Sequence, residues 1–70
     1  MQDKVGEVLN CAQEILFVIA EKEIPHNIGI MGSLEAGVRL IKFNQKCDTV
    51  TAIAHLKKVL EQIEIAEKGN

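Results

Sequence analysis

An unbroken apolar run, Ile-Leu-Phe-Val-Ile-Ala, occupies residues 15–20 inside a segment that otherwise has the pattern of an amphipathic helix. Successive residues on a helix point about 100° apart, so a run of this length turns apolar side chains to every side. Packing on one face cannot cover them all. We therefore expect this segment to meet a partner surface, with a second copy of the chain as the default partner.

The helix that contains this run is predicted to span about residues 2–23. Asp3 is a suitable capping residue or first-turn anion. Ile24 stands before Pro25, and a residue before proline is pushed out of the helical region, so the helix ends there. Apolar residues follow the i, i+3, i+4, i+7 spacing at Val5, Val8, Leu9, Ala12, Ile15, Leu16 and Ile19.

A second helix is predicted over about residues 27–44, and the sequence leaves its start open. Asn27 is a good cap directly after Pro25 and favours the longer helix. In the alternative the helix begins at Ser33 after a loop, because glycine costs about 1 kcal/mol inside a helix. The glycines concerned are Gly29, Gly32 and Gly37. We favour the longer helix, in which the first and last of them share a face with Ser33 that lets another helix approach closely.

A polar break at residues 44–48 precedes a third predicted helix over about residues 49–67, with Asp48 or Thr49 as its cap. Its apolar stripe is Val50, Ile53, Leu56, Val59, Leu60, Ile63 and Ala66. The aliphatic composition, with aromatic residues at only 3%, suits helix packing better than a sheet. The sequence therefore predicts one all-α domain, residues 1–70, built as a small three-helix bundle.

Chain length supports the expectation of self-association. A chain of 70 residues buries only about 60% of the surface that its unfolded form exposes, yet 47% of its residues are hydrophobic. Small domains often gain stability by oligomerising. We expect a homodimer formed through the first helix, with the interaction residues Cys11, Ile15, Phe17, Val18 and Ile19.

The formal net charge of −2 argues against nonspecific binding to nucleic acid or to an anionic membrane. One local basic group stands out, with Arg39, Lys42 and Lys46 at helical spacing. It predicts a contact with an anion and supports an alternative function, a nucleic-acid-associated regulator. Pairing with the acidic first helix, within the chain or between copies, is the other explanation of this patch.

No residue pattern indicates catalysis, a metal or a cofactor. Cys11, Cys47, His26 and His55 are the only candidate thiols and imidazoles, and they lack the short paired spacings of a zinc site. The glycine-rich segment 29–33 lacks the preceding strand and the Gly-Lys-Ser/Thr ending of a phosphate loop. We expect that the protein is not an enzyme.

The same sequence bears on location. No apolar run approaches the roughly 18 residues that span a membrane, and the N-terminus has no cleavage-site pattern. Two cysteines do not form a disulfide framework. We expect a cytoplasmic protein without a membrane partner.

Two segments resemble a family of small uncharacterised archaeal all-helical proteins. Ile24-Pro25-His26-Asn27-Ile28 is similar to the Ile/Val-Pro-x-Asn-Ile/Val break of that family, and Val50–Leu56 contains its Ala-Ile-x-x-Leu run. The chain departs from the family by its extra glycines and by stopping before a final helix. The resemblance implies an all-helical bundle and brings no activity. The function expected is that of an adaptor or regulator that self-associates and binds partners.

Overall fold

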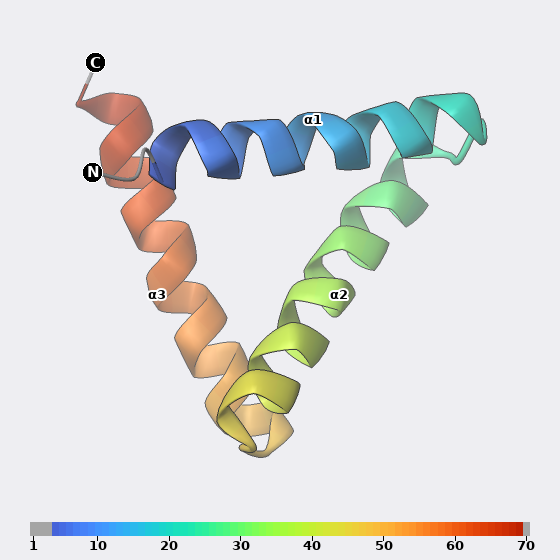
Figure 1. Cartoon of the computed structure of the whole chain (residues 1–70). Helices are drawn as coiled ribbons and strands as arrows, with labels where there is room; N and C mark the ends of the chain where they lie inside the picture. The colour runs from blue at the N-terminus through green and yellow to red at the C-terminus, as the bar shows by residue number, and fades with distance from the viewer. Residues whose placement is uncertain (1–3, 70) are drawn as a thin grey trace. The chain divides into compact units, whose positions relative to one another are not determined.

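The computed structural model describes residues 4–69, and among these it contains three α-helices and no strand (Figure 1). The helices are α1 (Lys4–Glu21), α2 (His26–Gln45) and α3 (Thr49–Lys68). The predicted three-helix, all-α class is confirmed. The expected start of the first helix at residue 2, with Asp3 as its cap, lies outside the described residues.

Two compact units, residues 1–33 and residues 34–70, divide the chain within α2. Unit 1 contains α1 and the start of α2, and unit 2 contains the rest of α2 together with α3. That the two units form a single domain, and that the helices form one bundle, stay predictions.

The connection between α1 and α2 is a tight turn. Glu23 adopts the left-handed conformation, with φ of 54°. Its N–H donates to the Ala20 carbonyl at 3.1 Å, and the Ile24 N–H donates to the Ile19 carbonyl at 3.0 Å, the two bonds of a Schellman motif. The Gly29 N–H then donates to the Pro25 carbonyl at 2.9 Å as α2 begins. The chain therefore reverses within residues 22–25.

Gly29 is the buried residue of α2, and it lies against Ile19 of α1. A Cβ added to Gly29 would lie 3.1 Å from Ile19 Cδ1 and 3.3 Å from Ile19 Cγ2. At Gly32, one turn further along α2, a Cβ would meet no atom within 4 Å. Of these two glycines, only Gly29 makes room for α1. The start at His26 agrees with the longer of the two helices that the sequence left open. The expected cap was wrong, because Asn27 lies inside α2 and the Pro25 carbonyl accepts the first helical hydrogen bond.

Unit 2 has its own contact between helices and its own helix cap. A Cβ on Gly37 would lie 3.6 Å from Leu56 Cδ1 of α3, which is ordinary contact. Asp48 caps α3 in an extended conformation, and its carboxylate accepts the Thr51 N–H at 2.8 Å. Ala52 is fully buried, the buried hydrophobic residue among those described.

Exchanging the glycines of α2 for alanine tests the contact at Gly29. Gly32→Ala should raise the free energy of unfolding by about 1 kcal/mol, because alanine favours helix and its methyl group meets open space. Gly29→Ala gains the same helix propensity but must displace the stiff, β-branched side chain of Ile19, so its gain should be smaller or negative. Chemical denaturation of both variants measures the difference. Equal gains at the two positions would contradict the Ile19–Gly29 packing.

The cap of α3 makes stability depend on pH. Hydrogen bonds from the Thr51 side chain and N–H hold the pKa of Asp48 below its ordinary value of 3.8. A lowered folded-state pKa means that the carboxylate stabilises the fold above its unfolded pKa and that this contribution is lost as the pH falls through the folded pKa.

Asp48→Asn keeps an oxygen acceptor and removes the titration. Wild type should therefore lose melting temperature relative to Asp48→Asn when the pH falls well below 3.8. Asp48→Ala should melt lower than Asp48→Asn at neutral and at acid pH, because it removes the acceptor. Thermal unfolding followed by circular dichroism compares the three. A constant difference between wild type and Asp48→Asn at every pH would argue against a stabilising carboxylate.

Candidate interaction surface

Four of the five predicted interaction residues on α1 are exposed. Cys11 is exposed, Ile15 and Val18 are each 43% exposed, and Phe17 is 66% exposed. Ile19 differs from the other four: it is half-buried, because it lies against Gly29 of α2. The apolar run at residues 15–20 groups Ile19 with Phe17 and Val18, but the contact with Gly29 determines how much of its side chain is exposed.

Unit 1 leaves most of the apolar surface of α1 uncovered. The part of α2 in this unit, residues 26–33, makes about two turns, whereas α1 makes about five. No residue of α1 is buried. Exposed large apolar side chains therefore run along the whole helix, from its first turn to its last: Val5, Val8, Leu9, Ile15, Leu16, Phe17 and Val18.

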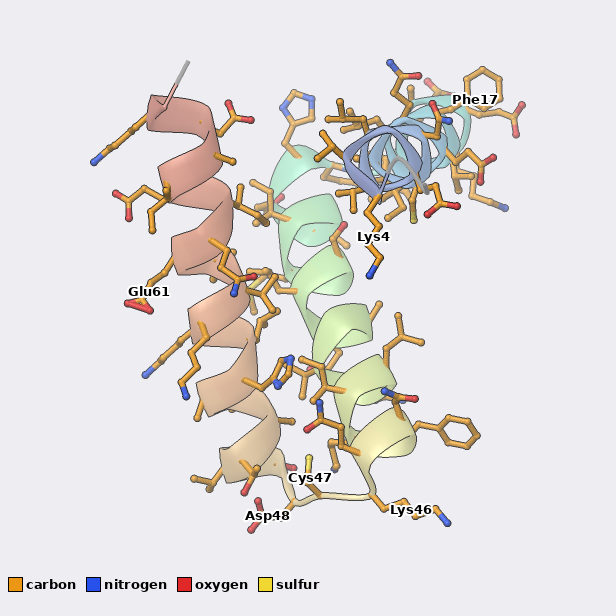
Figure 2. All side chains as sticks on the ribbon, turned by 60° about the vertical axis from the view of Figure 1, so that its left-hand side comes forward. Lys4, Phe17, Lys46, Cys47, Asp48 and Glu61 are labelled. Carbon is orange, nitrogen blue, oxygen red and sulfur yellow. The ribbon has the colours of Figure 1, made fainter. Side chains whose placement is uncertain are left out.

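Phe17 lies apart from the main apolar stripe of α1. Together with Val18 it lines a shallow hollow whose other residues are Asn10, Gln13 and Glu14. Its ring projects outward from the helix (Figure 2). Glu14 stands three residues before Phe17 and Glu21 four residues after it, the spacings that bring side chains together on a helix. Phe17 is thus an exposed aromatic ring between two carboxylates.

The predicted anion-contact residues lie in unit 2, and two of them share a hollow there. Arg39 Nε donates to Glu35 Oε2 at 3.0 Å, an exposed ion pair within α2. Lys42 Nζ donates to Thr49 Oγ1 at 3.0 Å. The lining of the hollow is Glu35, Val38, Arg39, Lys42, Phe43, Cys47, Thr49 and Ile53. Lys46 is not among these residues, and it follows α2 with φ of 52°.

Sequence reasoning missed the apolar half of this hollow. Phe43, one of the two aromatic residues of the chain, is 86% exposed. Val38 is half-buried and Ile53 is 40% exposed. The available signal was the position of Phe43 four residues after Arg39, the spacing that brings an aromatic ring and a cation together on a helix.

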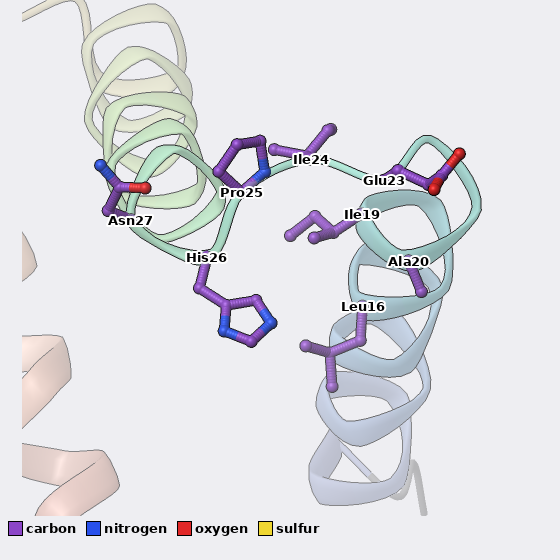
Figure 3. Close-up of a pocket in the computed structure, with 8 residues that line it drawn as sticks. All are labelled: Leu16, Ile19, Ala20, Glu23, Ile24, Pro25, His26 and Asn27. Carbon is purple, nitrogen blue, oxygen red and sulfur yellow. The ribbon is translucent and has the colours of Figure 1, made fainter.

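A second hollow lies in unit 1, where the end of α1 meets the start of α2 (Figure 3). Leu16 and His26 face each other across it. The tight turn at Glu23 creates it, which is why the sequence did not predict it. Its lining residues are Leu16, Ile19, Ala20, Glu23, Ile24, Pro25, His26 and Asn27.

The described residues provide little for chemistry. Among residues 4–69 no three His, Cys, Asp or Glu side chains are grouped as a metal site requires, and no polar or charged side chain is buried. Cys11 and Cys47 are free thiols. Within the same range, no helix is both long and apolar enough to cross a membrane. What the structure presents is apolar surface bordered by exposed charge.

Comparison of the chain with protein-family models, with curated proteins and with solved structures gives no match. The resemblance to small archaeal all-helical proteins therefore stays a prediction.

Proposed function

We propose that the protein acts by binding rather than by catalysis, as a small interaction module that associates with a second copy through α1. The observation that carries this proposal is the exposed apolar surface of α1. Its C-terminal part lies against the start of α2, and most of its large side chains have no cover within unit 1. Such surface favours association, because apolar area removed from water stabilises the complex.

The free energy expected from burying this surface supports a dimer of moderate affinity. A large apolar side chain contributes about 1.5–3 kcal/mol when fully buried. If five of the seven exposed large side chains of α1, each about half exposed, become buried on each of two copies, their burial contributes on the order of 10 kcal/mol to association. Association itself costs about 4–15 kcal/mol. Burial of the apolar surface of α1 therefore offsets about the whole free-energy cost of association, and further contacts then set the affinity.

A regulator or adaptor role in the cytoplasm follows as part of the same proposal. Two free thiols suit a reducing compartment, where disulfides are rare. Other proteins that present an apolar helix could use the same surface of α1. A nucleic-acid role has less support, because the net charge of the chain is −2 and the Glu35 carboxylate lies beside Arg39, where it would repel a phosphate backbone.

Sedimentation equilibrium of wild type and of two α1 variants tests the proposal. Wild type should be dimeric at micromolar concentration. Phe17→Glu and Val18→Glu should each weaken association by at least about tenfold, because the dimer would then have to bury an unpaired carboxylate. Gln62→Glu, which adds the same charge at an exposed position of α3, is the matched control and should leave association unchanged.

Helix content by circular dichroism should be equal in all four proteins, because the changed side chains are exposed. A wild type that stays monomeric would refute self-association. Equal weakening by Gln62→Glu would show that net charge, and not the surface of α1, controls the mass.

A further inference from the structure

Both aromatic residues of the chain are exposed. Phe17 is 66% exposed on α1 and Phe43 is 86% exposed on α2, and the sequence has no tryptophan or tyrosine. Aromatic side chains bury about 150–250 Å² each, and they are enriched in the buried centres of protein interfaces. Both phenylalanine side chains are therefore exposed and available for burial at a protein interface.

The charges around the two rings are opposite. Glu14 and Glu21 flank Phe17 at helical spacing, three residues before it and four after it. Phe43 borders the hollow of unit 2, whose lining includes the cations of Arg39 and Lys42. Half-buried Val38 adds apolar surface to that lining. One surface is an aromatic ring between acids. The other is an apolar hollow with two bases, Arg39 and Lys42, and one acid, Glu35, which is paired with Arg39.

We propose that Phe17 of a second copy docks in the hollow of unit 2, with its Glu14 and Glu21 beside Arg39 and Lys42. This inference rests on the proposed self-association and names the surface that α1 binds. Charge complementarity favours a second copy as the occupant, because the chain itself carries both members of the pair. A two-fold dimer forms the contact twice and then closes.

The cations can take new partners while they keep their present ones. Arg39 has five N–H donors, and its Nε bond to Glu35 leaves the others available. Lys42 has three donors, of which one is directed to Thr49. Charges at such a rim act mainly on the rate and specificity of association, whereas burial of the ring supplies affinity. The pairing therefore selects α1 over other apolar helices.

Reciprocal charge reversal tests this contact. The acid variant carries Glu14→Lys and Glu21→Lys, and the base variant carries Arg39→Glu and Lys42→Glu. Each variant alone should associate at least about tenfold more weakly than wild type, because like charges then meet. An equimolar mixture should form a heterodimer that binds more tightly than either variant binds itself, because both of its contacts then join opposite charges. The reversed α1 of the acid variant meets the reversed hollow of the base variant, and the unchanged α1 of the base variant meets the unchanged hollow of the acid variant.

Two control variants on α3 carry the same changes in net charge. Glu61→Lys with Glu67→Lys matches the acid variant, and Lys57→Glu with Lys58→Glu matches the base variant. These residues are exposed and lie outside the hollow. The controls should associate as wild type does, with sedimentation equilibrium as the common measurement.

The failures of the two proposals can be told apart. If wild type is dimeric and the base variant dimerises equally well, self-association stands and the hollow is not the site. If the mixture associates no better than the separate variants, the contact is not between two copies, and a contact within one chain or another occupant takes its place. A monomeric wild type contradicts the proposed function and this contact together.

Cross-linking checks the same contact without any change of charge. Cys47 lines the hollow as a half-buried free thiol. In a chain with Cys11→Ser and Gln13→Cys, which keeps Phe17 and places a thiol beside it on α1, air oxidation should join the introduced thiol of one copy to Cys47 of the other, and peptide mapping identifies the bond. Intermolecular bonds that join only like positions, 13 to 13 or 47 to 47, would overturn the proposed docking.

Discussion

The contact between Ile19 and Gly29 organises unit 1. A glycine at this position lets the side chain of Ile19 lie against the backbone of α2, at distances where an alanine methyl group would be crowded. The Schellman turn around Glu23 directs the chain into this contact within residues 22–25. The glycine costs helix propensity, and close packing offsets that cost. One helical turn later, Ser33 Oγ donates to the Gly29 carbonyl at 2.8 Å within α2.

A pair of helices has no enclosed interior, and both units show the consequence. Unit 1 buries Gly29 and unit 2 buries Ala52, two of the smallest residues in the described part of the chain. Larger apolar side chains on all three helices remain exposed. Helical proteins gain most of their stability from packing amphipathic faces together, so these faces require cover. We propose that self-association buries the apolar surface of α1, and that this surface binds the hollow of unit 2 in a second copy.

Local sequence signals predicted the helices well because each has a local physical cause. Pro25 forces a break, Asp48 supplies an acceptor for free N–H groups, and apolar spacing marks the stripes. The start of α2 was harder, since three glycines argued against the longer helix that the structure has. The cost of glycine to helix propensity can be read from the local sequence. The packing of Gly29 and Gly37 against neighbouring helices, which offsets that cost, cannot.

The candidate surface was predictable only in part for the same reason. Exposure of Cys11, Ile15, Phe17 and Val18 agrees with an apolar run too long for one face. That Ile19 is half-buried depends on a glycine ten residues away. The joining of Arg39 and Lys42 with Phe43, Cys47 and Ile53 depends on how α2 and α3 pair. Periodicity within one helix indicates the pairing of Arg39 with Phe43, but it carries no information about Cys47 and Ile53, which lie beyond the end of α2.

Hydrogen exchange of the backbone amides of α1, measured over a range of protein concentration, tests the central claim most directly. If a second copy covers α1, the protection of amides around residues 11–18 should rise with concentration, because association suppresses local opening. Amides of α3 around residues 60–66, which lie outside α1 and outside the lining of the unit 2 hollow, should change less. Protection of α1 that is independent of concentration would contradict self-association through this helix.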